Sequence, residues 1–364
     1  MAIDQYVAEY RTRDWQEIEE GRLRIAMIGL GWWTLEEAMP AVEQSSFCET
    51  TVVISGDAEK AARVRDENET VQRSLTYDEF HDGAATDAYD AIYVCTPNAF
   101  HKQYVETAAE LDKAVLCEKP LEASVERAEG LVAAADDGDI PLMTAYRMQT
   151  DPDVRRMREL IQEGAIGEPV AIEGHMTQTM LEVASDDVNQ WRVNPDLAGY
   201  GASVMDLGIY PLNTARFVLG ADPVAAQGSM RSKRQAFSDV PDEYASFMVE
   251  YDDGVVATCI ASQNAQLSGR FSVIGTDGEL TIDPIFLAQT PQTLRLRADD
   301  RTVEIDSGRR DMMGDEMTEE FDYFADRVLR GADIGPDGEH GLLDMRALAA
   351  IYEAADTGER VEIA

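Results

Sequence analysis

The stretch LRIAMIGLGWWT, residues 23–34, decides the fold of this 364-residue chain. An apolar run leads straight into a turn of the form GxGxx(G/A/T), Gly29-Leu30-Gly31-Trp32-Trp33-Thr34, which should open a helix. The first glycine permits a tight turn, the second lets a pyrophosphate approach the backbone, and the helix N-terminus supplies oriented N–H groups. The motif predicts the start of a dinucleotide-binding fold, with a plain glycine turn as the alternative.

Strand and helix patterns alternate from Leu23 to about Arg147. Four further apolar runs, TTVVISG, AIYVCTP, AVLCEKP and IPLMTAY, are separated by helical stretches of about ten residues. Such alternation is typical of βαβ units and a doubly wound parallel sheet. We therefore expect an α/β Rossmann domain over residues 22–147, preceded by a charged arm, residues 1–21, of the kind that clasps a neighbouring subunit.

The pattern changes after Arg147. A helix expected over residues 152–163 leads into runs with antiparallel alternation: PVAIEGHMTQ, YASFMVEY, GVVATCIAS, GRFSVIGT, GELTI and QTLRLRA. Asp-Gly pairs between several of them fit hairpin turns, and a last helix is expected over about residues 341–356. We predict a second, α+β domain over residues 148–364, built on an open, mainly antiparallel sheet.

Composition narrows the possible partners. Lys and Arg number 31 against 70 Asp and Glu, so the formal net charge is −39, and only five of the basic residues are Lys. No basic surface can displace counterions from nucleic acid or dock on an anionic membrane. Abundant acid with scarce Lys indicates a protein adapted to multimolar salt, where charge repulsion is screened. The alternative is an ordinary acidic protein.

The N-terminal segment lacks the basic and apolar regions of an export signal, and no run of 18 apolar residues occurs. Neither export nor membrane insertion is expected, and we predict a cytoplasmic protein. The four cysteines are dispersed and partly inside predicted strands, which indicates reduced core thiols. They share no ligand spacing with the four histidines, so no metal site is predicted.

The end of the second predicted strand bears on the choice of nicotinamide cofactor. It reads Ile54-Ser55-Gly56-Asp57, and Lys60 follows on the next helix. A small hydroxyl residue with a nearby ammonium suits a 2′-phosphate. We therefore predict NADP, whereas an Asp57 carboxylate turned toward the ribose would favour NAD.

Two more strand ends carry candidate groups. Thr96-Pro97-Asn98 precedes His101, which either contacts the nicotinamide or is a helix-start histidine with satisfied ring nitrogens. Glu118-Lys119-Pro120 ends the next strand, where ligands of doubly wound folds collect. Because Lys is scarce in this chain, Lys119 is a candidate catalytic group. Trp32 and Trp33 either shape the cofactor cleft or pack between domains.

Together these motifs resemble the glucose-fructose oxidoreductase / inositol dehydrogenase (Gfo/Idh/MocA) family. The resemblance runs from about Leu23 to the C-terminus and includes TPNxxH, the EKP tripeptide, and Gly199-Tyr200-Gly201 followed by Asp206-Leu207-Gly208-Ile209-Tyr210. The Ser-Gly-x-x-x-Lys fingerprint, Tyr146-Arg147 and Gln190-Trp191-Arg192 are similar to the NADP-dependent branch. Two departures set the chain apart: Tyr210 stands where the inositol dehydrogenases have His, and the export signal of the secreted members is absent.

The resemblance implies NADP-dependent oxidation of an aldose at C1, with D-xylose as the expected substrate and D-xylono-lactone as the product. It implies Lys119, Asp206 and Tyr210 as the catalytic set. The expected cofactor contacts, from the turn motif and from the resemblance together, are Gly29, Leu30, Gly31, Trp32, Trp33, Ser55, Gly56, Lys60, Tyr77, Thr96, Asn98, His101, Glu118, Lys119, Arg147, Trp191 and Arg192.

The residue types suit this chemistry. A base must take the C1 hydroxyl proton while hydride leaves for the nicotinamide, and a phenol with a pKa of about 10 needs an adjacent ammonium to favour its phenolate. Lys119 beside Tyr210 would supply that charge, and Asp206, four residues earlier, could orient Lys119 or a sugar hydroxyl. The alternatives are structural roles for Asp206 and Tyr210, an oxidoreductase acting on another sugar or a dihydrodiol, and a non-catalytic sugar- and dinucleotide-binding regulator.

The second domain also carries apolar residues on both faces of its predicted strands. Phe247, Val249 and Tyr251 alternate with Met248 and Glu250, and further apolar positions follow at Val255, Val256, Ala257 and Ile260. An outward face of this kind requires a partner, and an identical sheet is the commonest one. We predict a homodimer through this sheet or a homotetramer, with the arm of residues 1–21 reaching across.

Overall fold

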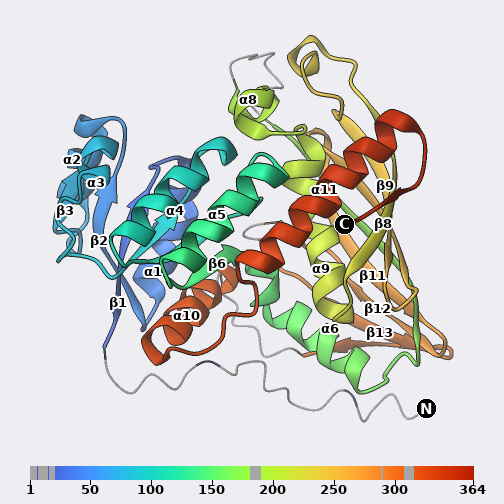
Figure 1. The fold of residues 1–364 in the computed structure, drawn as a ribbon. Helices are drawn as coiled ribbons and strands as arrows, with labels where there is room; N and C mark the ends of the chain where they lie inside the picture. Colours follow the sequence, from blue (N-terminus) through green and yellow to red (C-terminus); the bar gives the residue numbers. More distant parts are fainter. Residues whose placement is uncertain (1–5, 7–14, 16–20, 181–189, 288–289, 307–314) are drawn as a thin grey trace. The chain divides into compact units, whose positions relative to one another are not determined.

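A computed structural model describes residues 6, 15, 21–180, 190–287, 290–306 and 315–364 (Figure 1). Most of the predicted arm, residues 1–21, lies outside the described residues. The chain forms two compact units: one holds residues 13–147 and 314–342, and the rest of the chain forms the other. The domain limits predicted above, 22–147 and 148–364, stay a prediction. Within the described residues, no helix combines the length and apolar character that a membrane span requires.

The first unit contains the predicted parallel sheet. Its six strands run in the order β3-β2-β1-β4-β5-β6, and every neighbouring pair is parallel. The order reverses between β1 and β4, where doubly wound folds bind ligands beyond the carboxyl ends of the strands. The strand bounds are β1 Leu23–Ile28, β2 Cys48–Ile54, β3 Arg73–Leu75, β4 Ala91–Val94, β5 Ala114–Glu118 and β6 Leu142–Ala145.

Short helices connect these strands. Three of them begin at side-chain caps, Asp57, Thr76 and Ser124, each of which accepts a hydrogen bond from a free N–H of the first turn. The helix after the glycine turn instead begins with a π-helical turn, Thr34–Ala38. The helices are α1 Met39–Gln44, α2 Ala58–Glu67, α3 Tyr77–His81, α4 His101–Glu110 and α5 Val125–Asp137.

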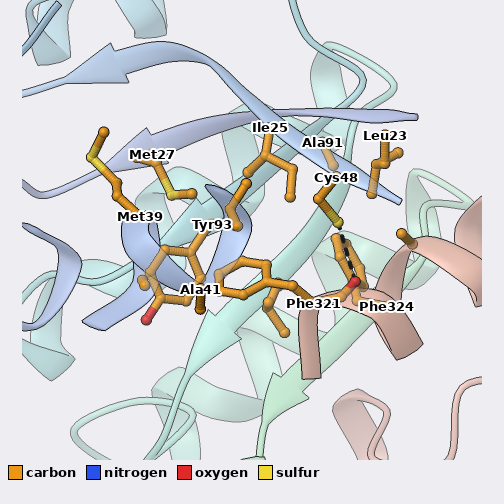
Figure 2. Packing of buried hydrophobic residues seen from close by; sticks show 14 of the residues in the cluster. Leu23, Ile25, Met27, Met39, Ala41, Cys48, Ala91, Tyr93, Phe321 and Phe324 are labelled. Atoms are coloured by element: carbon orange, nitrogen blue, oxygen red, sulfur yellow. Dashed lines mark hydrogen bonds between the residues drawn. The ribbon is translucent and has the colours of Figure 1, made fainter. Parts of the chain in front are cut away.

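The core of the first unit is completed by α10, Asp315–Arg330, a helix that the sequence analysis did not predict. Phe321 packs edge-on against Tyr93 of β4, with ring centroids 5.2 Å apart, and its carbonyl oxygen accepts a hydrogen bond from the Cys48 thiol at 3.3 Å (Figure 2). Phe324 lies fully buried in the same cluster. The sheet therefore depends on a segment far along the chain to cover it.

The second unit contains the predicted open sheet. Its nine described strands run in the order β14-β13-β12-β11-β7-β10-β9-β8-β15, and within this sheet the only parallel pair of described strands is β7 with β10. The mainly antiparallel architecture is confirmed, although β8, β14 and β15 were not predicted. The bounds are β7 Pro169–Thr179, β8 Pro223–Arg231, β9 Tyr244–Tyr251, β10 Val256–Ser262, β11 Asn264–Gly275, β12 Gly278–Ile282, β13 Leu294–Ala298, β14 Arg301–Ile305 and β15 Val361–Glu362.

Helices cover one face of this second sheet (Figure 1). At Gly174 of β7 a side chain would come within 2.7 Å of Pro211, so the glycine allows the covering helix to approach the strand. A π-helical turn, Val204–Gly208, precedes that helix. The helices of the second unit are α6 Pro152–Gln162, α8 Pro195–Ala198, α9 Ile209–Leu219 and the greater part of α11, Gly338–Thr357.

The strand alternation places the large apolar side chains of β9 inside. Phe247, Val249 and Tyr251 are buried under the helices, as are Val255 and Ala257 further along the chain. The outward face of β9 and β10 keeps Tyr244, Met248, Val256 and Ile260 as its aromatic and apolar residues. The apolar area on the outward face is therefore smaller than the sequence pattern indicated.

Candidate active site

The glycine turn after β1 has the geometry that a dinucleotide requires. Gly29 has φ +88°, and a side chain there would overlap the carbonyl oxygen of Cys95, so only glycine fits. At Gly31, apart from its two chain neighbours, no atom of the described residues lies within 4 Å of where a side chain would be, which leaves room for a phosphate to approach the backbone. The Thr34 hydroxyl donates a hydrogen bond to Gly29 O at 2.6 Å and locks the turn. Leu30 is buried beneath it.

The end of β2 shows what Asp57 does. Its carboxylate accepts a hydrogen bond from the Lys60 N–H at 3.0 Å and caps α2, while its own N–H donates to the Ser55 hydroxyl oxygen at 3.2 Å. The carboxylate is thus directed at the helix and not at a ribose. This arrangement supports the prediction of NADP over the NAD alternative.

Tyr77 closes the same edge of the sheet. Its ring covers Gly56, where a side chain would come within 3.1 Å of the ring carbons. Burial raises the pKa of the Tyr77 phenol, whose ring centre lies 5.4 Å from that of Tyr104. Ser55, Gly56, Lys60 and Tyr77 therefore lie around one strand end.

His101 links the ends of β4 and β5. The ring is fully buried, with Nε2 at 3.0 Å from Thr96 O and Nδ1 at 3.1 Å from Leu121 O. Asn98 is buried in the short 3-10 turn, Asn98–Phe100, that precedes it. This geometry favours the helix-start alternative for His101, in which the imidazole holds two strand-end loops together.

Glu118 is the centre of a polar cluster beneath Lys119. Its carboxylate accepts hydrogen bonds from the Tyr93 hydroxyl at 2.6 Å, from Trp33 Nε1 at 3.1 Å and from the Lys119 N–H at 3.2 Å. Trp33 therefore packs within the first unit, whereas the Trp32 side chain is 65% exposed. The Lys119 side chain, partly buried, follows directly at the strand end.

Arg147 extends this cluster after β6. Its guanidinium pairs with the buried Glu316 of α10 at 2.8 Å and lies 5.7 Å from the centre of the Trp33 ring. In the strand order, β5 and β6 are on the opposite side of β1 from β2. Arg147 and Lys119 therefore lie toward the end of the sheet away from Ser55 and Lys60.

The second unit holds the other predicted residues. Asp206 lies in the π-helical turn, and its Oδ2 accepts hydrogen bonds from Arg192 Nε at 3.0 Å and from Gln263 Nε2 at 2.6 Å. The Arg192 guanidinium also stacks on Trp191, with 4.5 Å to the ring centre. Trp191, Arg192 and Asp206 are thus one connected group.

Gln263 is a site residue that the sequence analysis missed. It is fully buried between β10 and β11, and its side-chain oxygen Oε1 accepts a hydrogen bond from Gln178 Nε2 at 2.9 Å. A glutamine between two apolar strands has no sequence signal. Tyr210, in the first turn of α9, is partly buried, with its ring 5.6 Å from that of Phe286.

The predicted site residues therefore fall into two sets. Gly29 to Arg147 belong to the first unit, and Trp191 to Tyr210 belong to the second. Within the described residues, no three His, Cys, Asp or Glu side chains are grouped as a metal would require. All four cysteines lie in described residues and are free, and burial raises the pKa of the Cys48, Cys117 and Cys259 thiols.

Comparison with protein families assigns both parts of the chain. Residues 23–146 match the oxidoreductase family with an NAD-binding Rossmann fold, and residues 154–281 match the GFO/IDH/MocA C-terminal domain. The chain belongs to the GFO/IDH/MocA oxidoreductase family. It is 50% identical over 365 residues, covering 100% of both chains, to D-xylose 1-dehydrogenase [NADP(+)] of Haloarcula marismortui.

Two further proteins match nearly the whole chain, one in sequence and one in structure. D-xylose 1-dehydrogenase (NADP(+)) 2 of Haloferax volcanii is 30% identical over 348 residues, which cover 94% of this chain and 100% of that protein. The crystal structure of aldose-aldose oxidoreductase from Caulobacter crescentus, complexed with glycerol, superposes with a TM-score of 0.86 at 28% identity, covering 94% and 100% of the two chains.

Proposed function

We propose that this protein is an NADP-dependent sugar dehydrogenase that oxidises D-xylose at C1 to D-xylono-lactone. The observation that carries the proposal is the 50% identity, over the full length of both chains, to a D-xylose 1-dehydrogenase [NADP(+)]. The glycine turn offers its backbone to the pyrophosphate of the cofactor. The end of β2 and the lysine at the end of β5 offer the side chains that such a reaction needs.

The residues at the end of β2 fit NADP. Ser55 and Lys60 can hold a 2′-phosphate, and the Asp57 carboxylate that would repel it is tied to the start of α2 at 3.0 Å. The open backbone at Gly31 fits the pyrophosphate. When bound, NADP+ supplies the acceptor for the hydride from C1.

The proton of the C1 hydroxyl is handled by the chain itself. Tyr210 is proposed as its acceptor and Lys119 as the cation that favours the phenolate, because an unassisted phenol with a pKa of about 10 is a poor base near neutral pH. Asp206 is proposed to accept a hydrogen bond from a sugar hydroxyl. Its two donors, Arg192 and Gln263, fix the direction of the carboxylate.

A second candidate is an oxidoreductase with a wider range of aldoses. It is favoured by the likeness to the Caulobacter crescentus aldose-aldose oxidoreductase, at 28% identity and a TM-score of 0.86. The decisive experiment is a steady-state assay of pentoses and hexoses with NADP+ and with NAD+ in multimolar KCl. We expect D-xylose with NADP+ to give the highest kcat/KM. Faster oxidation of D-glucose would favour the second candidate, and no turnover of any sugar would contradict both.

We also propose a homodimer or homotetramer formed through the outward face of the second sheet. One side chain on that face supports it, Ile260 of β10, which is 49% exposed and alternates with the buried Cys259 and Ala261. Light scattering in multimolar KCl tests the proposal, and a mass near 40.2 kDa would contradict it.

The remaining proposals concern conditions and partners. The net charge of −39 supports a protein that acts in a salt-rich cytoplasm and binds neither nucleic acid nor membranes. We expect the protein to unfold or dissociate in dilute buffer and to recover when multimolar KCl is restored, as followed by circular dichroism. Full stability in dilute buffer would contradict the salt adaptation.

A further inference from the structure

The motif Gly199-Tyr200-Gly201 leads into the π-helical turn that carries Asp206, and the proposed mechanism gives this motif no task. It lies between α8 and that turn, within the second unit. At Gly201 a side chain would overlap Asp242 Oδ1 and would come within 2.6 Å of the Tyr352 hydroxyl oxygen. Glycine at position 201 therefore allows two polar side chains to reach the start of the turn.

Asp242 is fully buried and binds backbone N–H groups at the start of this turn. Its Oδ1 accepts a hydrogen bond from Ala202 N at 2.7 Å, and its Oδ2 accepts one from Val204 N at 2.8 Å. The first N–H groups of a helix have no partner within the helix, and burial without an acceptor is costly for them. The Asp242 carboxylate therefore fixes two of these groups, one with each oxygen.

Tyr352 of α11 adds a third contact to the same segment. Its hydroxyl donates a hydrogen bond to Asp242 Oδ2 at 2.6 Å and accepts one from Met205 N at 3.3 Å. A phenol can do both, because its oxygen carries one proton and free lone pairs. The Tyr200 ring lies 5.8 Å from the Tyr352 ring and restricts its movement. The carboxylate and the phenol together thus bind three backbone N–H groups within residues 202–205.

The position of Asp206 depends on this segment. The Asp206 N–H donates to Ala202 O at 3.2 Å, so the residue whose N–H binds Asp242 also binds Asp206. The Ser203 hydroxyl, next to Ala202, accepts a hydrogen bond from Gln263 N at 3.0 Å. Gln263 is one of the two donors to the Asp206 carboxylate. Both the carboxylate and this donor are therefore attached to the segment that Asp242 fixes.

We propose that Asp242 and Tyr352 are positioning residues that orient the Asp206 carboxylate toward the sugar. They act through the backbone of residues 202–206, and a hydrogen bond weakens steeply when its direction is wrong. The effect on the sugar rests on the proposed function, in which Asp206 accepts a hydrogen bond from a sugar hydroxyl. The rigidity of the turn is a property of the second unit and is measurable without substrate.

The test is Tyr352→Phe, which removes the hydroxyl and keeps the ring. In multimolar KCl, with folding checked by circular dichroism, we expect kcat/KM for D-xylose to fall about fivefold and the Kd for NADPH to stay within about twofold. A role in stability alone would leave kcat/KM of the folded enzyme unchanged. Equal losses of sugar kcat/KM and NADPH affinity would overturn the inference, because the effect would not be confined to the sugar.

Tyr323→Phe is the matched control. Its hydroxyl is on a similarly buried ring and also accepts a hydrogen bond from a backbone N–H, that of Gly335 at 2.9 Å, but in the first unit. The chemical change is therefore the same at a different place. This variant should leave both kcat/KM for D-xylose and the Kd for NADPH unchanged.

Amide hydrogen exchange, read by mass spectrometry of peptides covering residues 201–208, tests the contact without substrate. Exchange should be slow in the unmodified protein and about tenfold faster in Tyr352→Phe, and Tyr323→Phe should not change it. Unchanged exchange in Tyr352→Phe would overturn the inference. Faster exchange with unchanged sugar kinetics would support the contact and contradict the proposed role of Asp206. If Tyr352→Phe does not fold, fast exchange of these peptides in the unmodified protein would equally overturn the inference.

Discussion

The two units hold their functional side chains by different means. In the first unit the backbone does most of the work: Gly29 has a positive φ against Cys95, and Ser55 and Lys119 stand at the ends of parallel strands. In the second unit the positions depend on side chains, since Asp206 is oriented by Arg192 and Gln263. A site held by the backbone has a short sequence motif, because neighbouring residues form it. A site held by side chains is formed by residues far apart in the sequence, so it has no such motif.

The largest expected effect removes the lysine at the end of β5. Lys119→Ala should lower kcat about 10³-fold, within the range usual for a group that assists proton transfer, because the phenolate loses its cation. Binding of NADPH, followed by its fluorescence, should change by less than about threefold, since the turn and the β2 end are intact. An unchanged kcat would mean that Lys119, at the end of β5, is not a catalytic group.

The next effect tests the backbone of the first unit directly. Gly29→Ala should cost about 3 kcal/mol of unfolding free energy, because the side chain would overlap Cys95 O and the residue must keep φ +88°. Gly31→Ala is the matched control, since no described residue other than its chain neighbours comes within 4 Å of the added carbon. It should leave stability unchanged in chemical denaturation and weaken NADPH binding. Equal stability of the two variants would contradict the conclusion that the first unit requires glycine at position 29.

The side-chain network of the second unit should respond more mildly. Gln263→Ala removes the 2.6 Å hydrogen bond to Asp206, and we expect kcat/KM for the sugar to fall about tenfold while NADPH affinity is kept. Gln266→Ala, at an exposed position of β11, serves as the control and should have no effect. A loss of cofactor affinity in Gln263→Ala would show that the network does not serve the sugar alone.

Two buried acids, one in each unit, differ in their hydrogen-bond donors. Asp242 in the second unit accepts hydrogen bonds from the Tyr352 hydroxyl at 2.6 Å and from the backbone of Ala202 and Val204, whereas Glu320 has no such donors in the described part of the chain. We expect Asp242→Asn to lower the unfolding free energy at pH 8 by about 2 kcal/mol. Glu320→Gln should raise it at the same pH.

The direction of the stability change in Glu320→Gln follows from the raised pKa of Glu320 in the folded state. The stability that the bound proton contributes is full below the unfolded pKa of about 4.3 and is lost as the pH rises toward the folded value. The unfolding free energy of Glu320→Gln relative to the unmodified protein should therefore increase between pH 5 and pH 8, by about 1.4 kcal/mol for each pH unit over which only the unfolded chain is ionised, measured by denaturation in KCl. A pH-independent difference would show that Glu320 is not held neutral.

The smallest effects concern the β2 end. Asp57→Ala removes a helix cap and should cost about 1 kcal/mol while the preference for NADP+ is kept. Ser55→Asp should instead shift the ratio of kcat/KM values toward NAD+ by about tenfold, because the new carboxylate faces the 2′-phosphate. If the ratio of the kcat/KM values for NADP+ and NAD+ does not change, the 2′-phosphate does not bind at Ser55.

Prediction from the sequence succeeded where local chemistry decides the structure. The GxG turn, the strand ends at Ser55 and Lys119 and the alternation of the second sheet all follow from nearby residues. The helix α10 was missed because its five buried acids resemble a solvated surface, and only its distant packing partners remove it from water. Gln263 and Glu320 were missed for the same reason, since their surroundings are assembled from several segments.

The late position of α10 in the chain also has a consequence for biosynthesis. Phe321 and Phe324 belong to the core around Tyr93, yet they are translated long after the last strand of the parallel sheet, which ends at Ala145. At roughly 5–20 residues per second, the ribosome needs on the order of ten seconds or more to make the intervening chain. During that interval the nascent sheet presents an uncovered apolar face, so a chaperone acting during translation would find its binding surface around Leu23, Ile25 and Tyr93.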